Sequence, residues 1–315
     1  MKALIYNGLD SVALVDRPIP KVQSPTDAIV KLTYTSICET DLHILKGHVP
    51  TVKPGTIIGH EGVGVVSEIG TEVKRFAKGD RVLISCMSSC GSCTYCQKGM
   101  YAHCSTGGWT LGNTLDGTQA QYVRVILADG SLHHIPDGVD EKALVMFSDN
   151  IPEGFECGTL NGRVQPGSTV AIIEAGGVGL SALMTALLYS PSVLIVIEKD
   201  PNGLKLAGKL GALRLINPDE EDAEGVVKTL TGGVGCETVI EAGGSPGTFE
   251  LAQRIVAPGG TIANTGFHAE KVGLHLENIM VSSYHVDVNF SDIESAYGVF
   301  GSRYENSVLK MVVAM

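Results

Sequence analysis

The chain has 315 residues, of which 44% are hydrophobic and 18% are charged. This composition is typical of a globular protein with a large core, and the length favours two domains over one. The 34 acidic and 23 basic residues give a formal net charge of -11. A surface of this sign repels phosphate backbones and anionic lipids, so we expect neither nucleic acid nor a membrane as a partner.

Residues 1–148 contain short β-like runs that are broken by Gly, Pro and Asp. The first segment, MKALIYNGLDSVALVDRP, predicts a strand, a turn and a second strand. It has no long apolar core and no cleavage pattern of small residues, so it does not resemble a secretory signal. Further runs are AIVKLTYTSIC, GVGVVSEIG and DRVLISC. We predict an irregular β domain over 1–148 in a cytoplasmic protein.

Four of the eight cysteines lie close together in the segment CGSCTYCQKGMYAHC, as Cys90, Cys93, Cys96 and Cys104. Four thiolates around one ion, with no open coordination position, are typical of a structural zinc site. A disulfide pair is the alternative, but disulfides belong to oxidising compartments and nothing in the sequence directs export. Reduced, metal-binding cysteines are the favoured interpretation.

A second group of metal-binding residue types is scattered along the chain. It comprises Cys38 in SICETDLH, His60 and Glu61 in IIGHEGVG, and Asp149 in MFSDN. One thiolate, one imidazole and one carboxylate would leave a tetrahedral zinc with one open position for water or substrate. Taken singly, each residue is better explained as a packed core residue or a surface residue, because a lone Cys or His usually has no other role.

Strands and helices alternate through residues 149–290. Strand-like runs such as TVAIIE, SVLIVIE, TVIEA and TIANTG are separated by amphipathic helical segments. This pattern predicts a doubly wound parallel sheet with helices on both faces. One stretch, Ala175 to Ile197, has no charged residue and approaches the length of a membrane helix. Its glycines, Pro191 and acidic flanks favour a strand, helix and strand instead.

The segment TVAIIEAGGVGL predicts the glycine turn of a dinucleotide-binding unit, because it follows a strand and opens a helix. Glu174 stands where the first glycine is expected, whereas the second and third glycines are present. The side chain of Glu174 would crowd the turn, and its charge would face a pyrophosphate. The predicted cofactor-binding residues of this turn are Gly176, Gly177, Val178 and Gly179.

Glu198, at the end of the next strand, suggests which dinucleotide is bound. An acid at this position accepts hydrogen bonds from the adenosine ribose and repels a 2′-phosphate, which favours NAD over NADP. Lys199 beside it keeps NADP as the alternative. Glu198 could also simply cap the strand.

GHEGVGVVSEIG, the four-cysteine lobe and the glycine turn, in this order, resemble the zinc-containing alcohol dehydrogenases of the medium-chain dehydrogenase/reductase family. The resemblance covers nearly the whole chain. It implies a GroES-like β domain over 1–148, to which 291–315 return, and a Rossmann domain over 149–290. It also implies catalysis between the domains and a homo-oligomer, either a dimer or a tetramer.

The resemblance assigns roles to the scattered ligands. Cys38, His60 and Asp149 match the ligands of a catalytic zinc, and Glu61 matches a neighbouring acid that can approach the metal. The chain would then hold two zinc ions, one catalytic and one structural. An aspartate as third ligand is typical of the microbial branch, which acts on secondary and other small alcohols.

Further residues match the reaction machinery of the family. Thr40 matches the hydroxyl that hydrogen-bonds the substrate oxygen, and His43 matches the outer proton acceptor; a solvent-facing histidine is the alternative for His43. Asp41 is expected to support His60. Trp109, the only tryptophan, lies where the family lines its substrate pocket, although core packing is equally compatible.

Two further departures from the family concern the cofactor. Glu39 stands where this branch commonly has glycine and other branches have a pyrophosphate-binding arginine, and the passage LHLENIMVSSYHVDVN is shorter than usual. The expected function is NAD-dependent oxidation of a small alcohol to an aldehyde or ketone, and the reverse. The rival is a non-catalytic relative with impaired cofactor binding. A zinc-independent quinone reductase of the same superfamily would need neither metal cluster.

Overall fold

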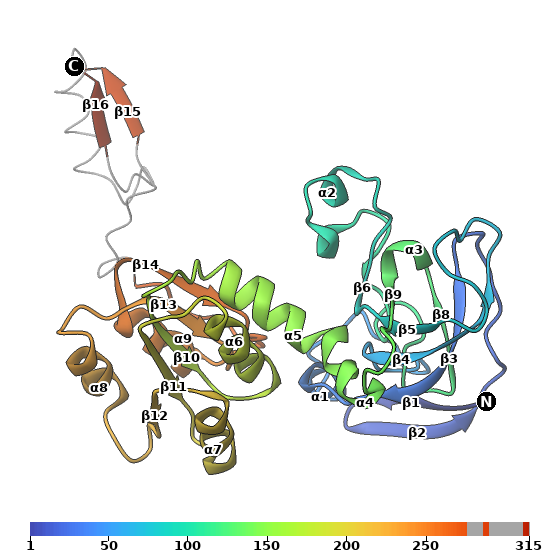
Figure 1. Cartoon of the computed structure of the whole chain (residues 1–315), viewed down its shortest axis with the longest axis horizontal. Coiled ribbons are helices and arrows are strands. Elements are labelled where there is room, and N and C mark those ends of the chain that lie inside the picture. The colour runs from blue at the N-terminus through green and yellow to red at the C-terminus, as the bar shows by residue number, and fades with distance from the viewer. Residues whose placement is uncertain (276–285, 290–310, 315) are drawn as a thin grey trace.

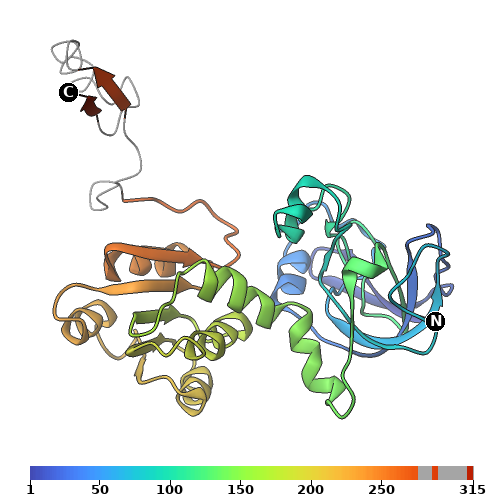
Figure 2. The same cartoon turned by 45° about the horizontal axis from the view of Figure 1, so that its top comes forward.

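The computed structural model describes residues 1–275, 286–289 and 311–314. Within these residues the molecule has two halves, a β-rich N-terminal half and a second half built on a parallel sheet (Figure 1). A helical segment, green in the figures, joins them (Figure 2). The predicted fold, a GroES-like β part followed by a Rossmann-like parallel sheet, is confirmed. The exact domain boundaries remain a prediction.

The N-terminal half begins with a hairpin of β1 (Lys2–Gly8) and β2 (Ser11–Asp16), which confirms the predicted strand, turn and strand. Five antiparallel strands then form a sheet in the order β8-β3-β4-β5-β9. The strands are β3 (Ala28–Thr35), β4 (Gly62–Ile69), β5 (Arg81–Ile84), β8 (Tyr122–Val125) and β9 (Leu132–His134). Short elements complete this half: α1 (Glu39–Leu45), β6 (Met87–Ser88), α2 (Thr94–Gln97), η1 (Tyr101–His103), β7 (Gly108–Trp109) and α3 (Ala128–Ser131).

The connecting helical segment leads from the first half into the second. It consists of α4 (Glu141–Leu144), η2 (Val145–Ser148), α5 (Asn150–Glu153) and the π-helical η3 (Gly154–Leu160). Asp149 breaks the segment, with φ −146° and ψ −69° between η2 and α5. Further on, a Cβ at Gly154 would lie 2.5 Å from the backbone nitrogen of Ala182, so the absence of a side chain lets this segment pack closely against the next helix.

The second half is a five-stranded parallel sheet in the order β12-β11-β10-β13-β14. The strands are β10 (Thr169–Ile173), β11 (Val193–Ile197), β12 (Arg214–Ile216), β13 (Cys236–Glu241) and β14 (Val256–Asn264). The helices are α6 (Gly177–Leu187), α7 (Pro201–Leu210), α8 (Ala223–Leu230) and α9 (Pro246–Ile255). The strand order reverses between β10 and β13, the kind of point at which open α/β sheets bind ligands.

Alternating side chains of β10 explain why both faces of the sheet are covered. Val170 and Ile172 point into one core with α6 and α7, whereas Ala171 and Ile173 point into a second core with α8 and α9. All four are buried, as expected when successive side chains of a strand face opposite sides.

The uncharged stretch from Ala175 to Ile197 is divided into a turn, helix α6 and strand β11, as predicted. Across the described part of the chain, no helix combines the length and the hydropathy needed to cross a bilayer.

Near the C-terminus the structure describes only β15 (Val286–Asn289) and β16 (Met311–Ala314), which pair in parallel. Most of the shortened passage, and the predicted return of 291–315 to the first domain, lie outside the described residues.

Candidate active site

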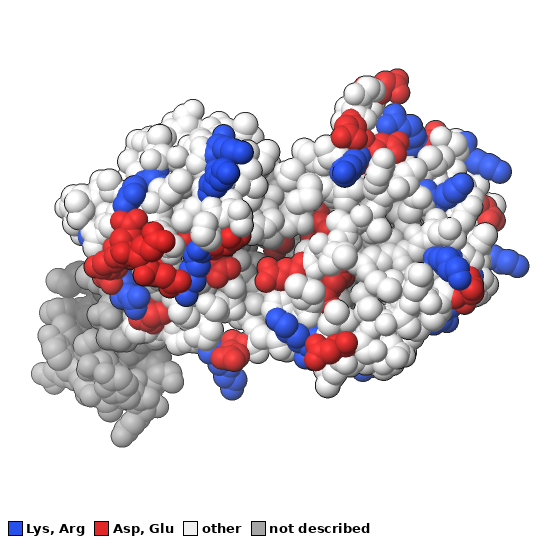
Figure 3. All heavy atoms as spheres, turned by 90° about the horizontal axis from the view of Figure 1, so that it is seen from below, with Lys and Arg blue, Asp and Glu red and all other residues white. Residues whose placement is uncertain are grey.

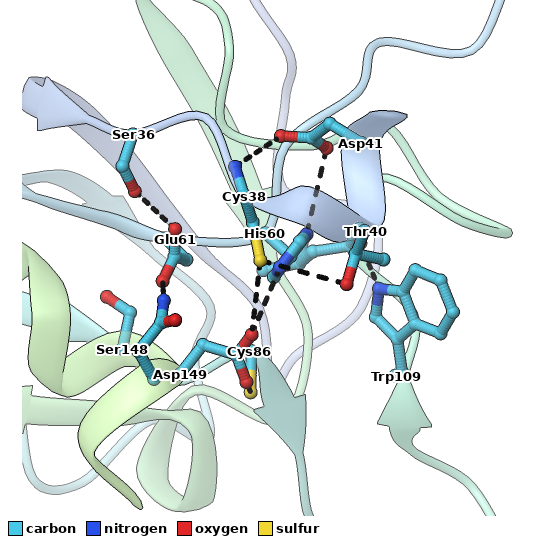
Figure 4. Close-up of polar contacts among 12 residues, drawn as sticks. Ser36, Cys38, Thr40, Asp41, His60, Glu61, Cys86, Trp109, Ser148 and Asp149 are labelled. Carbon is cyan, nitrogen blue, oxygen red and sulfur yellow. Dashed lines mark hydrogen bonds and ion pairs between the residues drawn. The ribbon is translucent and has the colours of Figure 1, made fainter. Parts of the chain in front are cut away.

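Three of the predicted zinc ligands come together in the folded chain. Cys38 is the N-cap of α1, His60 lies two residues before β4, and Asp149 lies at the break in the connecting segment. One ligand atom from each lies within 4.8 Å of the others. His60 Nε2 is 3.2 Å from Asp149 Oδ2, and Cys38 Sγ is 4.0 Å from the same oxygen (Figure 4). Residues 111 positions apart in the chain therefore form one group.

His60 shows that this group suits a metal ion. Its side chain is buried, and neither ring nitrogen has a hydrogen-bond partner among the described residues. Buried polar atoms without partners are rare, and a sulfur, nitrogen and oxygen donor set is one that zinc accepts. Burial would lower the pKa of His60, but Asp149 and Cys38 raise it to about 11. The anionic neighbours thus favour a cation here, which a divalent metal provides.

Asp41 contacts the residues that carry this site, namely the backbone of Cys38 and the ring of His60. Its Oδ2 accepts hydrogen bonds from the backbone N–H of Cys38 at 3.0 Å and from Nε2 of Gln119 at 2.8 Å. Its Oδ1 lies 3.9 Å from Nδ1 of His60, which is an ion-pair distance and too long for a hydrogen bond. Asp41 therefore fixes the turn that carries Cys38 and faces the second nitrogen of His60.

Glu61 lies next to the ligand group without joining it. Its carboxylate accepts hydrogen bonds from Asn150, at 2.6 Å, and from Ser36. The thiol of Cys86 approaches Asp149 Oδ1 to 2.9 Å and donates to that oxygen. Sequence reasoning missed Cys86 and Asn150, because neither stands in a spacing that distinguishes it from a core residue.

Helix α1 carries the two predicted proton-handling residues. Thr40 Oγ1 lies 3.7 Å from Sγ of Cys38, within the range of a hydrogen bond to sulfur. His43 follows three residues later, on the same side of the helix. The ring of His43 packs against Phe267 of the second half, with 4.5 Å between ring centroids. This contact places His43 where the two halves meet.

Trp109 contacts both His60 and the core of the first half. Its ring stands edge-on to His60, with centroids 6.0 Å apart, and its Nε1 donates to the carbonyl of Leu111 at 3.0 Å. It also packs against a buried cluster that contains Ile44 and Ile58. A substrate-lining role therefore stays a prediction.

The four-cysteine lobe forms the second candidate metal site. The sulfurs of Cys90, Cys93, Cys96 and Cys104 lie within 4.8 Å of one another, and all four cysteines are free. The N–H groups of Cys93 and Cys96 point at the sulfurs of Cys90 and Cys93, at 3.3 and 3.5 Å. Hydrogen bonds led by that of Ser92 lower the pKa of Cys90 to about 5. Cys90 is thus favoured as a thiolate, the form that binds zinc, whereas burial and the neighbouring cysteines raise the pKa of Cys96.

The glycine turn keeps the predicted geometry despite Glu174. Glu174 has φ +71°, the left-handed conformation that glycine adopts without strain. A Cβ at Gly179 would lie 2.0 Å from the carbonyl oxygen of Glu174, so this glycine is required for the helix to approach the strand. At Gly176 a Cβ would meet nothing within 4 Å, which leaves open space at the start of α6 for a ligand.

Several carboxylates surround this turn. The side chain of Glu174 lies against Gly243, where a Cβ would come within 2.7 Å of Oε1. Burial raises the pKa of Glu174, and the charges of Glu198, Glu39 and Glu241 raise it further. Glu39 belongs to the first half, so its charge acts on Glu174 from the other side of the groove between the halves. Figure 3 shows acidic side chains on both sides of that groove.

Glu198 holds the turn through both carboxylate oxygens. Oε2 accepts from the N–H of Ala175 at 2.6 Å, and Oε1 accepts from the N–H of Asp200 at 2.8 Å. A carboxylate that accepts these two hydrogen bonds has lone pairs left for further donors. The side chain of Lys199 is largely exposed, and its Nζ lies 3.5 Å from Oδ1 of Asp219. The charged side chains of Glu174, Glu198, Lys199 and Asp219 line a cavity of about 460 Å³.

Asn150 connects the two parts of the site. Its Nδ2 donates to Glu61, beside the metal ligands, and its Oδ1 lies 2.4 Å from the position of a Cβ at Gly177. The metal ligands and the start of α6 therefore lie close together.

Two family models match the chain, one over each half. Residues 24–137 match the alcohol dehydrogenase GroES-like domain, and residues 177–307 match the zinc-binding dehydrogenase domain. The chain belongs to the zinc-binding alcohol dehydrogenase family. Membership confirms the predicted family, and it supports zinc and a nicotinamide dinucleotide as the ligands of this oxidoreductase family.

Relatives of this alcohol dehydrogenase family member occur in fungi and bacteria. It is 38% identical over 275 residues to zinc-type alcohol dehydrogenase B of Aspergillus flavus, which covers 85% of this chain and 64% of that protein. It is 32% identical over 272 residues to the NADP-dependent isopropanol dehydrogenase of Thermoanaerobacter brockii, covering 86% and 77%. The apo structure of zinc-dependent alcohol dehydrogenase 2 from Streptococcus pneumoniae has a TM-score of 0.84 at 42% identity, covering 100% of this chain and 99% of that chain.

Proposed function

We propose that the protein oxidises a small primary or secondary alcohol to an aldehyde or ketone, and catalyses the reverse reaction, with a nicotinamide dinucleotide as hydride acceptor and donor. The observation that carries this proposal is the group formed by Cys38, His60 and Asp149, in which both nitrogens of His60 are buried without a hydrogen-bond partner. Asn150 links this group to the start of α6, where a dinucleotide would bind.

Each residue has a role in this proposal. Cys38, His60 and Asp149 would hold the catalytic zinc, which lowers the pKa of a bound hydroxyl group. Thr40 would accept the hydroxyl proton of the substrate, and His43 would take it toward solvent. Asp41 keeps Cys38 and His60 in position through the contacts described above. The four-cysteine lobe would hold a second, structural zinc.

We propose NAD as the dinucleotide. The carboxylate of Glu198 is held in place by two backbone N–H groups, and it would stand unpaired against a 2′-phosphate. The NADP dependence of the Thermoanaerobacter relative, together with Lys199, supports NADP as the alternative. A homo-oligomer, as dimer or tetramer, stays a prediction from the resemblance.

A second candidate function is a non-catalytic relative that binds the dinucleotide poorly. The mutual repulsion among Glu174, Glu198 and Glu39 favours it, because the same charges would face a pyrophosphate. The third reading, a zinc-independent quinone reductase, gives no reason for two assembled metal-ligand groups.

Spectrophotometry with short primary and secondary alcohols and NAD tests the proposal. We expect alcohol-dependent NADH formation that disappears when a chelator removes zinc and returns when zinc is added. Activity that survives zinc removal would contradict the proposal and favour the zinc-independent reading. Binding of NADH without any turnover would favour the non-catalytic one.

A further inference from the structure

Helix α1 ends in the sequence HILKGH, and the geometry of this end brings two histidines together. Gly47 has φ +75°, its N–H donates to the carbonyl of Ile44 at 2.9 Å, and the N–H of His48 donates to the carbonyl of His43 at 3.0 Å. These two bonds form a Schellman motif, which places the residue after the glycine against the third-last residue of the helix. The backbone itself therefore pairs His48 with His43.

The side-chain contact at this motif is commonly apolar, but here it is a hydrogen bond between two imidazoles. Nδ1 of His43 lies 3.0 Å from Nδ1 of His48, and the ring centroids are 5.3 Å apart. At this distance one nitrogen donates a proton and the other accepts it. The two rings are thus joined by one N–H···N hydrogen bond.

The two rings differ in their surroundings. His43 is partly covered and faces Phe267 of the second half, whereas His48 is exposed. Burial lowers the pKa of His43; the positive charges of His48 and Lys46 act in the same direction, and Glu39 opposes them. Phe267 contributes no charge. His43 is therefore neutral near pH 7 and ready to accept a proton.

We propose that His48 is a second proton carrier, which takes from His43 the proton released by alcohol oxidation and passes it to water. The proposal rests on the proposed function. A proton arriving at Nε2 of His43 displaces the Nδ1 proton of that ring onto Nδ1 of His48, and Nε2 of His48 loses a proton to solvent. One proton enters and one leaves, and exchange with water restores the starting tautomers.

The variant His48→Gln tests the transfer, because an amide can hydrogen-bond to His43 but cannot carry a proton. We expect kcat for alcohol oxidation to fall about tenfold, with KM for the alcohol unchanged. Imidazole buffer should restore kcat in proportion to its concentration, while the unmodified enzyme stays indifferent to it. His134→Gln, at an exposed histidine of β9, is the matched control and should behave as the unmodified enzyme. Full turnover of His48→Gln, independent of buffer, would overturn the proposal.

A measurement without turnover separates this proposal from the proposed function. NMR titration of the imidazoles in the zinc-loaded protein should show that the pKa of His43 rises in His48→Gln, because the charge that a protonated His48 places beside His43 is then absent. An active enzyme whose two rings titrate independently would overturn the proton transfer alone. Coupled titration in a protein that oxidises no alcohol would overturn the proposed function, and this role with it.

Discussion

The metal-ligand group and the glycine turn lie close together, since Asn150 contacts both regions, yet their charges suit their ligands differently. Around His60, the thiol and carboxylates face a position that favours a cation. Around Glu174, carboxylates gather at the start of α6, where the helix dipole favours an anion. The backbone of the turn still makes the tight bend at Glu174, and helix α6 still packs closely against the strand at Gly179. The comparison teaches that a fold can keep the shape of a site while its electrostatics change.

Glu174 illustrates this separation in one residue. Its left-handed backbone fulfils the requirement of the turn, at a strain of about 1 kcal/mol or more for a residue with a side chain. Its carboxylate, by contrast, adds a charge that no feature of the turn requires. Variants of the metal-ligand group should therefore change zinc content and turnover, whereas variants of Glu174 should change the affinity for the dinucleotide.

The largest effect is expected for Cys38→Ala, which removes one ligand from the open metal group. Turnover should fall at least about a thousandfold, and zinc should fall from two ions to one per chain, because the cysteine lobe is separate. Elemental analysis and alcohol-dependent NADH formation measure both. Cys157→Ala, at an exposed cysteine outside both groups, is the control. One zinc per chain in the unmodified protein, unchanged in Cys38→Ala, would show that the group holds no metal.

Cys93→Ser should remove the zinc of the lobe while leaving the other in place. We expect a loss of at least about 2 kcal/mol in the free energy of unfolding, because metal binding to a structural site contributes directly to folding. Thermal unfolding with and without a chelator measures it. If a reducing agent, rather than the chelator, destabilises the unmodified protein, the lobe is a disulfide structure and the zinc interpretation is wrong.

A smaller effect is expected for Glu198→Gln, which removes the charge that would repel a 2′-phosphate. The ratio of NADPH to NADH affinity should rise about tenfold. The ratio is the proper readout, because any loosening of the Ala175 and Asp200 contacts affects both dinucleotides alike. Lys199→Gln should change the ratio little, since that side chain is exposed beside Asp219. A larger change for Lys199→Gln than for Glu198→Gln would instead favour NADP as the natural cofactor.

The smallest effect is a pH dependence of binding. Since the pKa of Glu174 is raised, this side chain takes up a proton as the pH falls through that raised value and becomes neutral. Affinity for ADP-ribose should then increase severalfold as the pH falls below the pKa of Glu174. Above that pKa the affinity should be weaker and should not change with pH. Calorimetry over this range should find a flatter dependence in Glu174→Gln. An identical pH dependence in the two proteins would assign the effect to another group.

The fold was largely predictable because the signals are local. Alternating apolar strands and amphipathic helices in the second half follow directly from burial on both sheet faces, as Val170 and Ala171 illustrate. The helical segment from Glu141 to Leu160 was not foreseen, because it is divided into short pieces and broken at Asp149. Its placement depends on packing against α6, which no local pattern reveals.

The candidate site divides in the same way. The cysteine lobe is visible in the spacing of one short segment, whereas joining Cys38 to Asp149 needed a resemblance to a known family. Cys86 and Asn150 acquire their contacts only when distant segments meet. His48 could have been noticed, since HILKGH holds a glycine that ends a helix between two histidines.

Titration of NADH into the zinc-loaded protein and its Glu174→Gly variant at low salt tests the central claim, that the dinucleotide site is intact in shape and weakened by charge. Glycine removes both the strain and the charge, so affinity should increase about tenfold to a hundredfold, which corresponds to about 1 to 3 kcal/mol. Glu174→Gln, which removes only the charge, should recover part of this gain, and that part should shrink at high salt. Equal NADH affinity in all three proteins at low salt would contradict the account.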